Sequence, residues 1–178
     1  MNAFDTALVV IDFQTALTPV MHNDIQLVEK TEILIKGARL LEIPIIVTQQ
    51  YTKGLGDTIP ELKEALGEFD SIDKTAFSCV GDKNFREALK NVHCKNIIIS
   101  GIEAHICVLQ TVIDLIDLGY NVFLAADCVG SRFKKDMRYA LRRMFAYGAV
   151  PTTAESVLFE IMKDAKHPAR KAVSALIK

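Results

Sequence analysis

Three residues of the sequence, Asp12, Lys74 and Cys107, have the types and the placement that a thiol-dependent catalytic site needs. Each occurs at or just after the end of a predicted strand: Asp12 after an apolar run, Lys74 at a short edge strand, and Cys107 where a helix begins after the run NIIISG. A cysteine thiol attacks an electrophilic carbon when a nearby carboxylate takes its proton, and a lysine ammonium stabilises the thiolate. A helix that starts beside the cysteine would add backbone N–H groups for a developing oxyanion. The three residues therefore point to nucleophilic catalysis by a cysteine.

Each of the three residues also has a purely structural interpretation. Asp12 could cap a turn or a helix, and Lys74 could be an ordinary solvated lysine. Cys107 could fill the core, because free cysteine is among the most buried residue types. Cys94 and Cys128 fit a packing role better still, whereas Cys79, five residues after Lys74, is a weaker thiol candidate with no helix start of its own. The residues alone leave catalysis and packing open.

The elements that must position these residues alternate between short apolar runs and longer segments of helical periodicity. The predicted strands cover residues 7–12, 43–49, 68–74, 96–100, 121–127 and 149–153. The predicted helices cover residues 25–42, 81–92, 104–118 and 134–148, and two short helices finish the chain. Residues 50–62 are predicted to form a glycine-containing loop.

Strands that are apolar on both faces and separated by helices predict an α/β fold with a parallel sheet covered on both sides. Right-handed crossovers make it a three-layer, doubly wound, mostly parallel six-stranded sheet with helices on both faces. No boundary or repeat divides residues 1–178, which we expect to form one domain. Ligands of such sheets bind outside the carboxyl ends of the strands, so Asp12, Lys74 and Cys107 should meet at that edge.

The composition is that of an ordinary globular protein. The chain has 178 residues, half of them hydrophobic, and a net charge of −1, which indicates neither a nucleic-acid partner nor a membrane partner. The N-terminus has no basic segment before its short apolar run, so we expect a cytoplasmic protein. Without a CxxC pair, the four cysteines are expected to be free thiols.

Five short segments occur in an order and at a spacing that resemble the isochorismatase-like cysteine hydrolase superfamily. They read ALVVIDFQ, VTQQY, DKTAFS, SGIEAHICV and AADCVGSR. That superfamily includes nicotinamidases and N-carbamoylsarcosine amidases, and the resemblance covers nearly the whole chain. The segment QYTKGLGDTIPEL is similar to the branch of isochorismatase domain-containing proteins.

The resemblance implies a role for each residue of the candidate site. Asp12 matches the general base, Cys107 matches the nucleophile, and Lys74 matches the lysine that stabilises the thiolate and orients Asp12. It also implies a cis peptide bond between Ile102 and Glu103. The backbone N–H groups of Glu103 and Cys107 would then form an oxyanion hole, while the side chain of Glu103 would be solvated.

Two departures from the family pattern narrow the chemistry. Nicotinamidases carry an Asp-x-His metal motif where this chain has Gln50 and Thr52, and no two of its four histidines have ligand spacing on one element. We therefore expect neither a metal nor another cofactor. Isochorismatases proper have glycine where this chain has Cys107. The retained cysteine favours nucleophilic attack on an acyl-type carbon.

Four further residues are candidates for contacts with a substrate. Gln14 follows Asp12 closely and could bind a polar group, and Tyr51, Phe77 and His105 occur on the loops that should surround the thiol. For each of them, packing or solvent exposure is an equally good interpretation.

The sequence thus predicts a cysteine hydrolase that cleaves the C–N bond of a small amide through a thioester. Hydrolysis of a vinyl ether is one alternative, and a non-catalytic scaffold is another. An activated Cys107 is expected to react with iodoacetamide well below the ordinary thiol pKa of about 8.5. The apolar stretches VLQTVIDLIDLGY and LRRMFAYG indicate a homo-oligomer.

Overall fold

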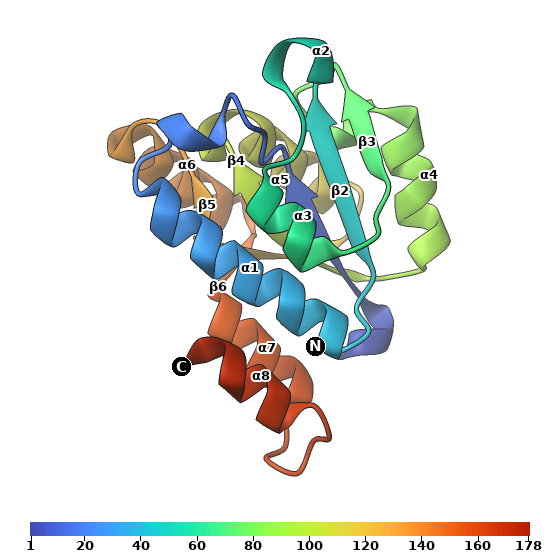
Figure 1. Cartoon of the computed structure of the whole chain (residues 1–178). Helices are drawn as coiled ribbons and strands as arrows, with labels where there is room; N and C mark the ends of the chain where they lie inside the picture. Colours follow the sequence, from blue (N-terminus) through green and yellow to red (C-terminus); the bar gives the residue numbers. More distant parts are fainter.

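A computed structural model describes residues 1–178 and shows a six-stranded sheet whose strands are all parallel. The strands lie in the order β3-β2-β1-β4-β5-β6, so the chain winds outward from β1 in both directions (Figure 1). Their bounds are β1 Thr6–Ile11, β2 Ile45–Gln50, β3 Ser71–Lys74, β4 Asn96–Ile102, β5 Asn121–Gly130 and β6 Val150–Thr152. The predicted doubly wound α/β fold is confirmed.

Helices cover both faces of the sheet and create two hydrophobic cores. One core packs α1, α3, α7 and α8 against the sheet, and the other packs α4, α5 and α6 against the opposite face. The helix bounds are α1 Asp24–Leu40, α2 Thr52–Leu55, α3 Pro60–Leu66, α4 Lys83–Val92, α5 Leu109–Asp117, α6 Lys134–Tyr147, α7 Ala154–Met162 and α8 Arg170–Ile177. None of these helices has the length and apolar character that crossing a membrane requires.

The central strand β1 shows why the sequence reads as continuously apolar. All six of its residues are buried, because successive side chains point into opposite cores. Leu8 and Val10 belong to one core, and Val9 and Ile11 belong to the other. The registers of the neighbouring strands place Thr48 and Gly101 beside Ile11, at the carboxyl edge of the sheet.

The structure differs from the predicted elements in three places. The predicted loop at 50–62 contains α2 and the start of α3, which begins at Pro60, a residue that suits the first helical position. The helix predicted from residue 104 begins with a π-helical turn, Ala104–Val108, before α5. Strand β5 continues to Gly130, beyond the predicted end at 127, by pairing with the end of β4.

Candidate active site

The carboxyl edge of the sheet brings Asp12 and Lys74 into direct contact. Lys74 ends β3, Asp12 follows β1, and the Lys74 Nζ atom lies 2.7 Å from Asp12 Oδ2. Both side chains are fully buried. Burial is the largest single effect and opposes the charge of Lys74, but Asp12 and the other neighbouring groups together outweigh it and raise the pKa of the lysine. Lys74 is therefore a buried ammonium. The alternative interpretation of Lys74 as an ordinary solvated lysine is excluded.

Three neutral oxygen atoms complete the surroundings of the Lys74 ammonium. Its Nζ atom donates to Gln50 Oε1 at 2.7 Å and to the carbonyl oxygens of Ala76 and Phe77 at 3.2 Å each. These acceptors come from the end of β2 and from the turn after β3. They hold the ammonium at one point and so fix the carboxylate that it contacts.

The second carboxylate oxygen of Asp12 is held by Thr48. The Thr48 hydroxyl donates to Asp12 Oδ1 at 2.8 Å and also lies 3.7 Å from the Cys79 sulfur. The backbone of Asp12 is in the left-handed region with φ of +57°, a conformation that aspartate adopts more readily than most residues. Asp12 is thus positioned by its own backbone turn and by one donor at each oxygen.

Cys107 lies in the π-helical turn at the start of α5 and is only 7% exposed. Burial and the neighbouring Asp12 carboxylate raise the pKa of the thiol far above its usual value, although Lys74 acts in the opposite direction. The resting group is therefore a thiol. The expectation of a thiolate with a lowered pKa is wrong, because burial and the Asp12 charge together outweigh the effect of Lys74 on the thiol.

The segment before Cys107 has the backbone arrangement that the sequence predicts. The peptide bond between Ile102 and Glu103 is cis. The Glu103 N–H has no hydrogen-bond acceptor within the protein. A buried N–H without a partner is uncommon, and one beside a nucleophile is available to an oxyanion.

The side chain of Glu103 differs from its expected solvated state. It is buried, and its Oε2 atom accepts hydrogen bonds from the backbone N–H of Arg132 at 3.0 Å and from Arg132 Nε at 3.2 Å. This contact ties the segment before Cys107 to the connection between β5 and α6. The prediction for the side chain was wrong because the connection that covers it comes from residues far along the chain.

The four candidate contact residues separate into two kinds. The Gln14 side chain is fully buried, and its amide binds the backbone N–H and C=O of Gln50 and the carbonyl of Gly56. We therefore assign Gln14 to holding the end of β2. His105 is half-buried, with Nδ1 3.0 Å from the Ser131 hydroxyl. Tyr51 and Phe77 are about half-exposed, and the backbones of both bond to Lys74.

Sequence reasoning missed Thr48 and Gln50 as members of the site. Both stand at the end of β2, and their side chains point to the same side because side chains alternate along a strand. The signal was present in VTQQ, where polar residues interrupt an Ile- and Val-rich strand at its carboxyl end. That is the same feature that identified Asp12.

A metal ion has no prepared position in this arrangement. No group of three His, Cys, Asp or Glu side chains is placed to hold one. Gln50, which takes the place of a metal-binding aspartate in nicotinamidases, uses its side-chain oxygen to bind Lys74.

The chain was compared with known proteins to test the resemblance. The isochorismatase domain profile matches residues 6–156. The chain belongs to the isochorismatase family. It is 39% identical to isochorismatase domain-containing protein 2 of Xenopus laevis over 81% of this chain and 69% of that protein. It is 34% identical to isochorismatase domain-containing protein 1 of Danio rerio, over 94% of this chain and 59% of that protein.

A further relative of this isochorismatase-family protein is the secreted isochorismatase effector Isc1 of Phytophthora sojae. The two are 34% identical over 97% of this chain and 84% of the effector. Relatives of this similarity therefore include a protein that is named as secreted.

Several solved structures share the fold over almost the whole chain. The MAR1 ribonuclease of Caenorhabditis elegans is 40% identical, with a TM-score of 0.93 over 99% of this chain and 91% of that one. YcaC of Pseudomonas aeruginosa, solved with hexane-2,5-diol and covalent acrylamide, is 25% identical, with a TM-score of 0.89 over 99% and 95%. The Escherichia coli YcaC protein, an octameric hydrolase of unknown specificity, matches in fold alone, at 23% identity and a TM-score of 0.93 over 99% and 88%.

Proposed function

We propose that this isochorismatase-family hydrolase cleaves the C–N bond of a small amide through a thioester on Cys107. Asp12 takes the thiol proton while the sulfur attacks the carbonyl carbon. The negative charge that develops on the carbonyl oxygen is held by the backbone N–H groups of Glu103 and Cys107. The tetrahedral intermediate then collapses, the C–N bond breaks, and Asp12 gives its proton to the departing nitrogen.

Hydrolysis of the thioester uses the same groups in the reverse order. Asp12 takes a proton from water, whose oxygen attacks the thioester carbon. The C–S bond breaks, the carboxylic acid leaves, and the proton on Asp12 returns to the sulfur. Lys74 remains an ammonium throughout, because its task is to hold Asp12 Oδ2 in position.

One observation carries this proposal: a fully buried Asp12–Lys74 ion pair lies beside a buried cysteine. Charges are rarely buried unless they are paired, and a buried carboxylate whose charge acts on a neighbouring thiol is suited to general-base catalysis. The raised pKa of Cys107 agrees with this scheme, since a thiol that is protonated at rest needs a base during attack. The scaffold alternative gives no reason to keep such a pair.

The size and chemistry of the substrate are inferred from the surroundings of the thiol. Asp12, Lys74 and Cys107 line none of the five main cavities, and Cys107 is only 7% exposed. A thiol with so little accessible surface favours a small substrate. YcaC of Pseudomonas aeruginosa, which was solved with covalent acrylamide, supports the presence of a reactive group accessible to small molecules on this fold.

Assembly and location are also part of the proposal. The octameric YcaC of Escherichia coli supports a homo-oligomer. We place the protein in the cytoplasm because its thiol chemistry and four free cysteines suit a reducing compartment.

Ribonuclease activity is a second candidate function, favoured by the MAR1 ribonuclease of Caenorhabditis elegans. The net charge of −1 opposes it, since RNA binding depends on an excess of cations. Incubation with a labelled single-stranded RNA separates the two candidates. Cleavage that depends on Cys107 would replace the amidase proposal.

The deciding experiment is a screen of small aliphatic and aromatic amides with ammonia or amine release as the readout. Mass spectrometry of acid-quenched reactions should find an acyl group on the peptide that contains Cys107. Cys107→Ala should lose both turnover and adduct, whereas Cys94→Ala should keep both, because Cys94 is buried and precedes β4, at the opposite edge of the sheet. Full turnover by Cys107→Ala on a confirmed substrate would refute the thioester scheme.

A further inference from the structure

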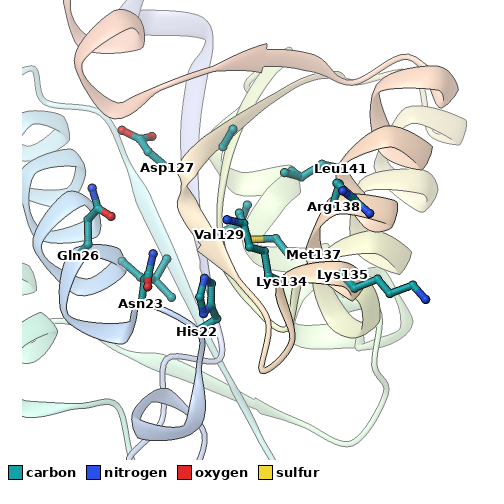
Figure 2. Close-up of a pocket in the computed structure, with 12 residues that line it drawn as sticks. His22, Asn23, Gln26, Asp127, Val129, Lys134, Lys135, Met137, Arg138 and Leu141 are labelled. Carbon is teal, nitrogen blue, oxygen red and sulfur yellow. The ribbon is translucent and has the colours of Figure 1, made fainter.

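A separate cavity lies where β6 stops and β5 continues. Strand β6 pairs only with residues Phe123 to Ala125 of β5, so the rest of β5, as far as Gly130, has no outer neighbour. The space beside this free stretch lies between the first turns of α1 and α6, and its volume is about 570 Å³ (Figure 2). That volume is in the range of small-molecule sites.

The floor of this cavity, which we name the α1–α6 pocket, is apolar. Leu27 of α1 and Val129 of β5 are buried beneath it, and Met137 and Leu141 of α6 form the opposite wall. A water-filled recess with such a floor gains free energy when it takes up an apolar group of matching size.

The rim of the pocket is cationic. Lys134, Lys135 and Arg138 line it from α6, and none of them forms an ion pair within the chain. Figure 2 shows the Lys134 side chain extending inward toward Val129, while Lys135 points away from α1. Lys134 is therefore the cation that would meet a bound group directly.

The one carboxylate in the lining is already occupied. Asp127 stands across the pocket from Lys134, and its Oδ1 atom accepts a hydrogen bond from the backbone N–H of Ala154 at 2.9 Å, at the start of α7. Its charge is thus partly compensated by that helix. Three side-chain cations against one carboxylate leave the pocket with an excess of positive charge.

We infer that the α1–α6 pocket binds a small organic anion, a carboxylate with an apolar body, because its volume of about 570 Å³ lies in the range of small-molecule sites. The apolar body lies on the floor above Leu27 and Val129, against the wall formed by Met137 and Leu141. The carboxylate contacts Lys134. The site is distinct from the candidate active site, because Asp12, Lys74 and Cys107 are all absent from the residues that line the pocket. The inference does not depend on the reaction at Cys107.

The test uses three probes with the same apolar body: hexanoate, 1-hexanol and hexylammonium. Isothermal titration of the whole protein should show saturable binding of hexanoate, with the other two at least tenfold weaker. Lys134→Glu should weaken hexanoate at least tenfold, and Lys134→Met should weaken it by a smaller factor. The matched control is Lys171→Glu, an exposed lysine on α8 at the other end of the molecule, which should bind like the wild type (Figure 1).

Three results would overturn the inference. The first is an absence of hexanoate binding, and the second is equal binding of hexanoate and 1-hexanol. The third is equal hexanoate affinity in the wild type and in Lys134→Glu, which would place the ligand elsewhere, including at Cys107. Sedimentation velocity is measured on the same variants, because a changed oligomeric state in Lys134→Glu would show that the pocket is an interface between copies of the chain.

Discussion

The buried ion pair between Asp12 and Lys74 should dominate both the stability and the activity of this protein. In Lys74→Met, the Asp12 carboxylate stays buried with the Thr48 hydroxyl as its remaining side-chain partner. Removing one partner of a buried pair leaves an uncompensated charge, and typically costs about 3–5 kcal/mol. We expect Lys74→Met to lose that much free energy of unfolding.

Removing the other partner of the pair should lower the free energy of unfolding by less. In Asp12→Asn, the Lys74 ammonium keeps its three neutral oxygen acceptors, so part of its stabilisation remains. The double variant buries no charge. We therefore expect its loss to be smaller than the sum of the two single losses by about 2–3 kcal/mol, the upper range for directly coupled residues.

The assay is urea unfolding at pH 7, followed by circular dichroism because the chain has no tryptophan. The raised pKa of Lys74 also determines how the stability contributed by the ion pair changes with pH. Its contribution is fully present below the pKa of lysine in the unfolded chain, about 10.4, and is lost only as the pH rises through the higher folded value. The coupling should therefore be equal at pH 6 and pH 9. Strictly additive losses, or coupling that vanishes by pH 9, would refute the reasoning.

Three other predictions concern the neighbours of this pair. Iodoacetamide labelling of Cys107, followed by peptide mass spectrometry, should increase only at alkaline pH above the ordinary thiol range; Asp12→Asn should move the increase to lower pH, because the Asp12 charge helps to raise the thiol pKa. Labelling that is unchanged in that variant would contradict the assignment. Thr48→Val should reduce kcat by about 10- to 100-fold, since hydrogen bonds to charged groups contribute about 1.5–3 kcal/mol, and Thr48→Ser should restore most of it. Gly101→Ala should lower the free energy of unfolding by about 1–3 kcal/mol, because the new Cβ would lie 2.5 Å from Ile11 Cβ. The control is Ser100→Ala, which should leave the free energy of unfolding unchanged, since the buried Ser100 hydroxyl has no hydrogen-bond partner. If urea unfolding showed equal losses for Ser100→Ala and Gly101→Ala, close packing against Ile11 would not be the cause.

The sequence determined the fold and the place of the proposed nucleophile in it. Periodicity distinguishes buried strands from amphipathic helices, and parallel strands place their carboxyl ends at one edge. Asp12, Lys74 and Cys107 could therefore be assigned to one site although they lie far apart along the chain. Family motifs supplied their roles and the cis peptide bond at Ile102–Glu103, which local residue patterns alone do not specify.

Only the tertiary structure decided how these groups share charge and hydrogen bonds. Lys74 was expected to favour a thiolate, but its ammonium donates hydrogen bonds to Asp12 and Gln50 instead. The distances between these groups depend on the packing of β1, β2 and β3. Burial then raises the pKa of Cys107. The partner of Glu103 likewise comes from Arg132, which the sequence does not connect to it. Residue types and strand order follow from local patterns, whereas desolvation and pairing depend on atoms that the fold brings together from distant segments.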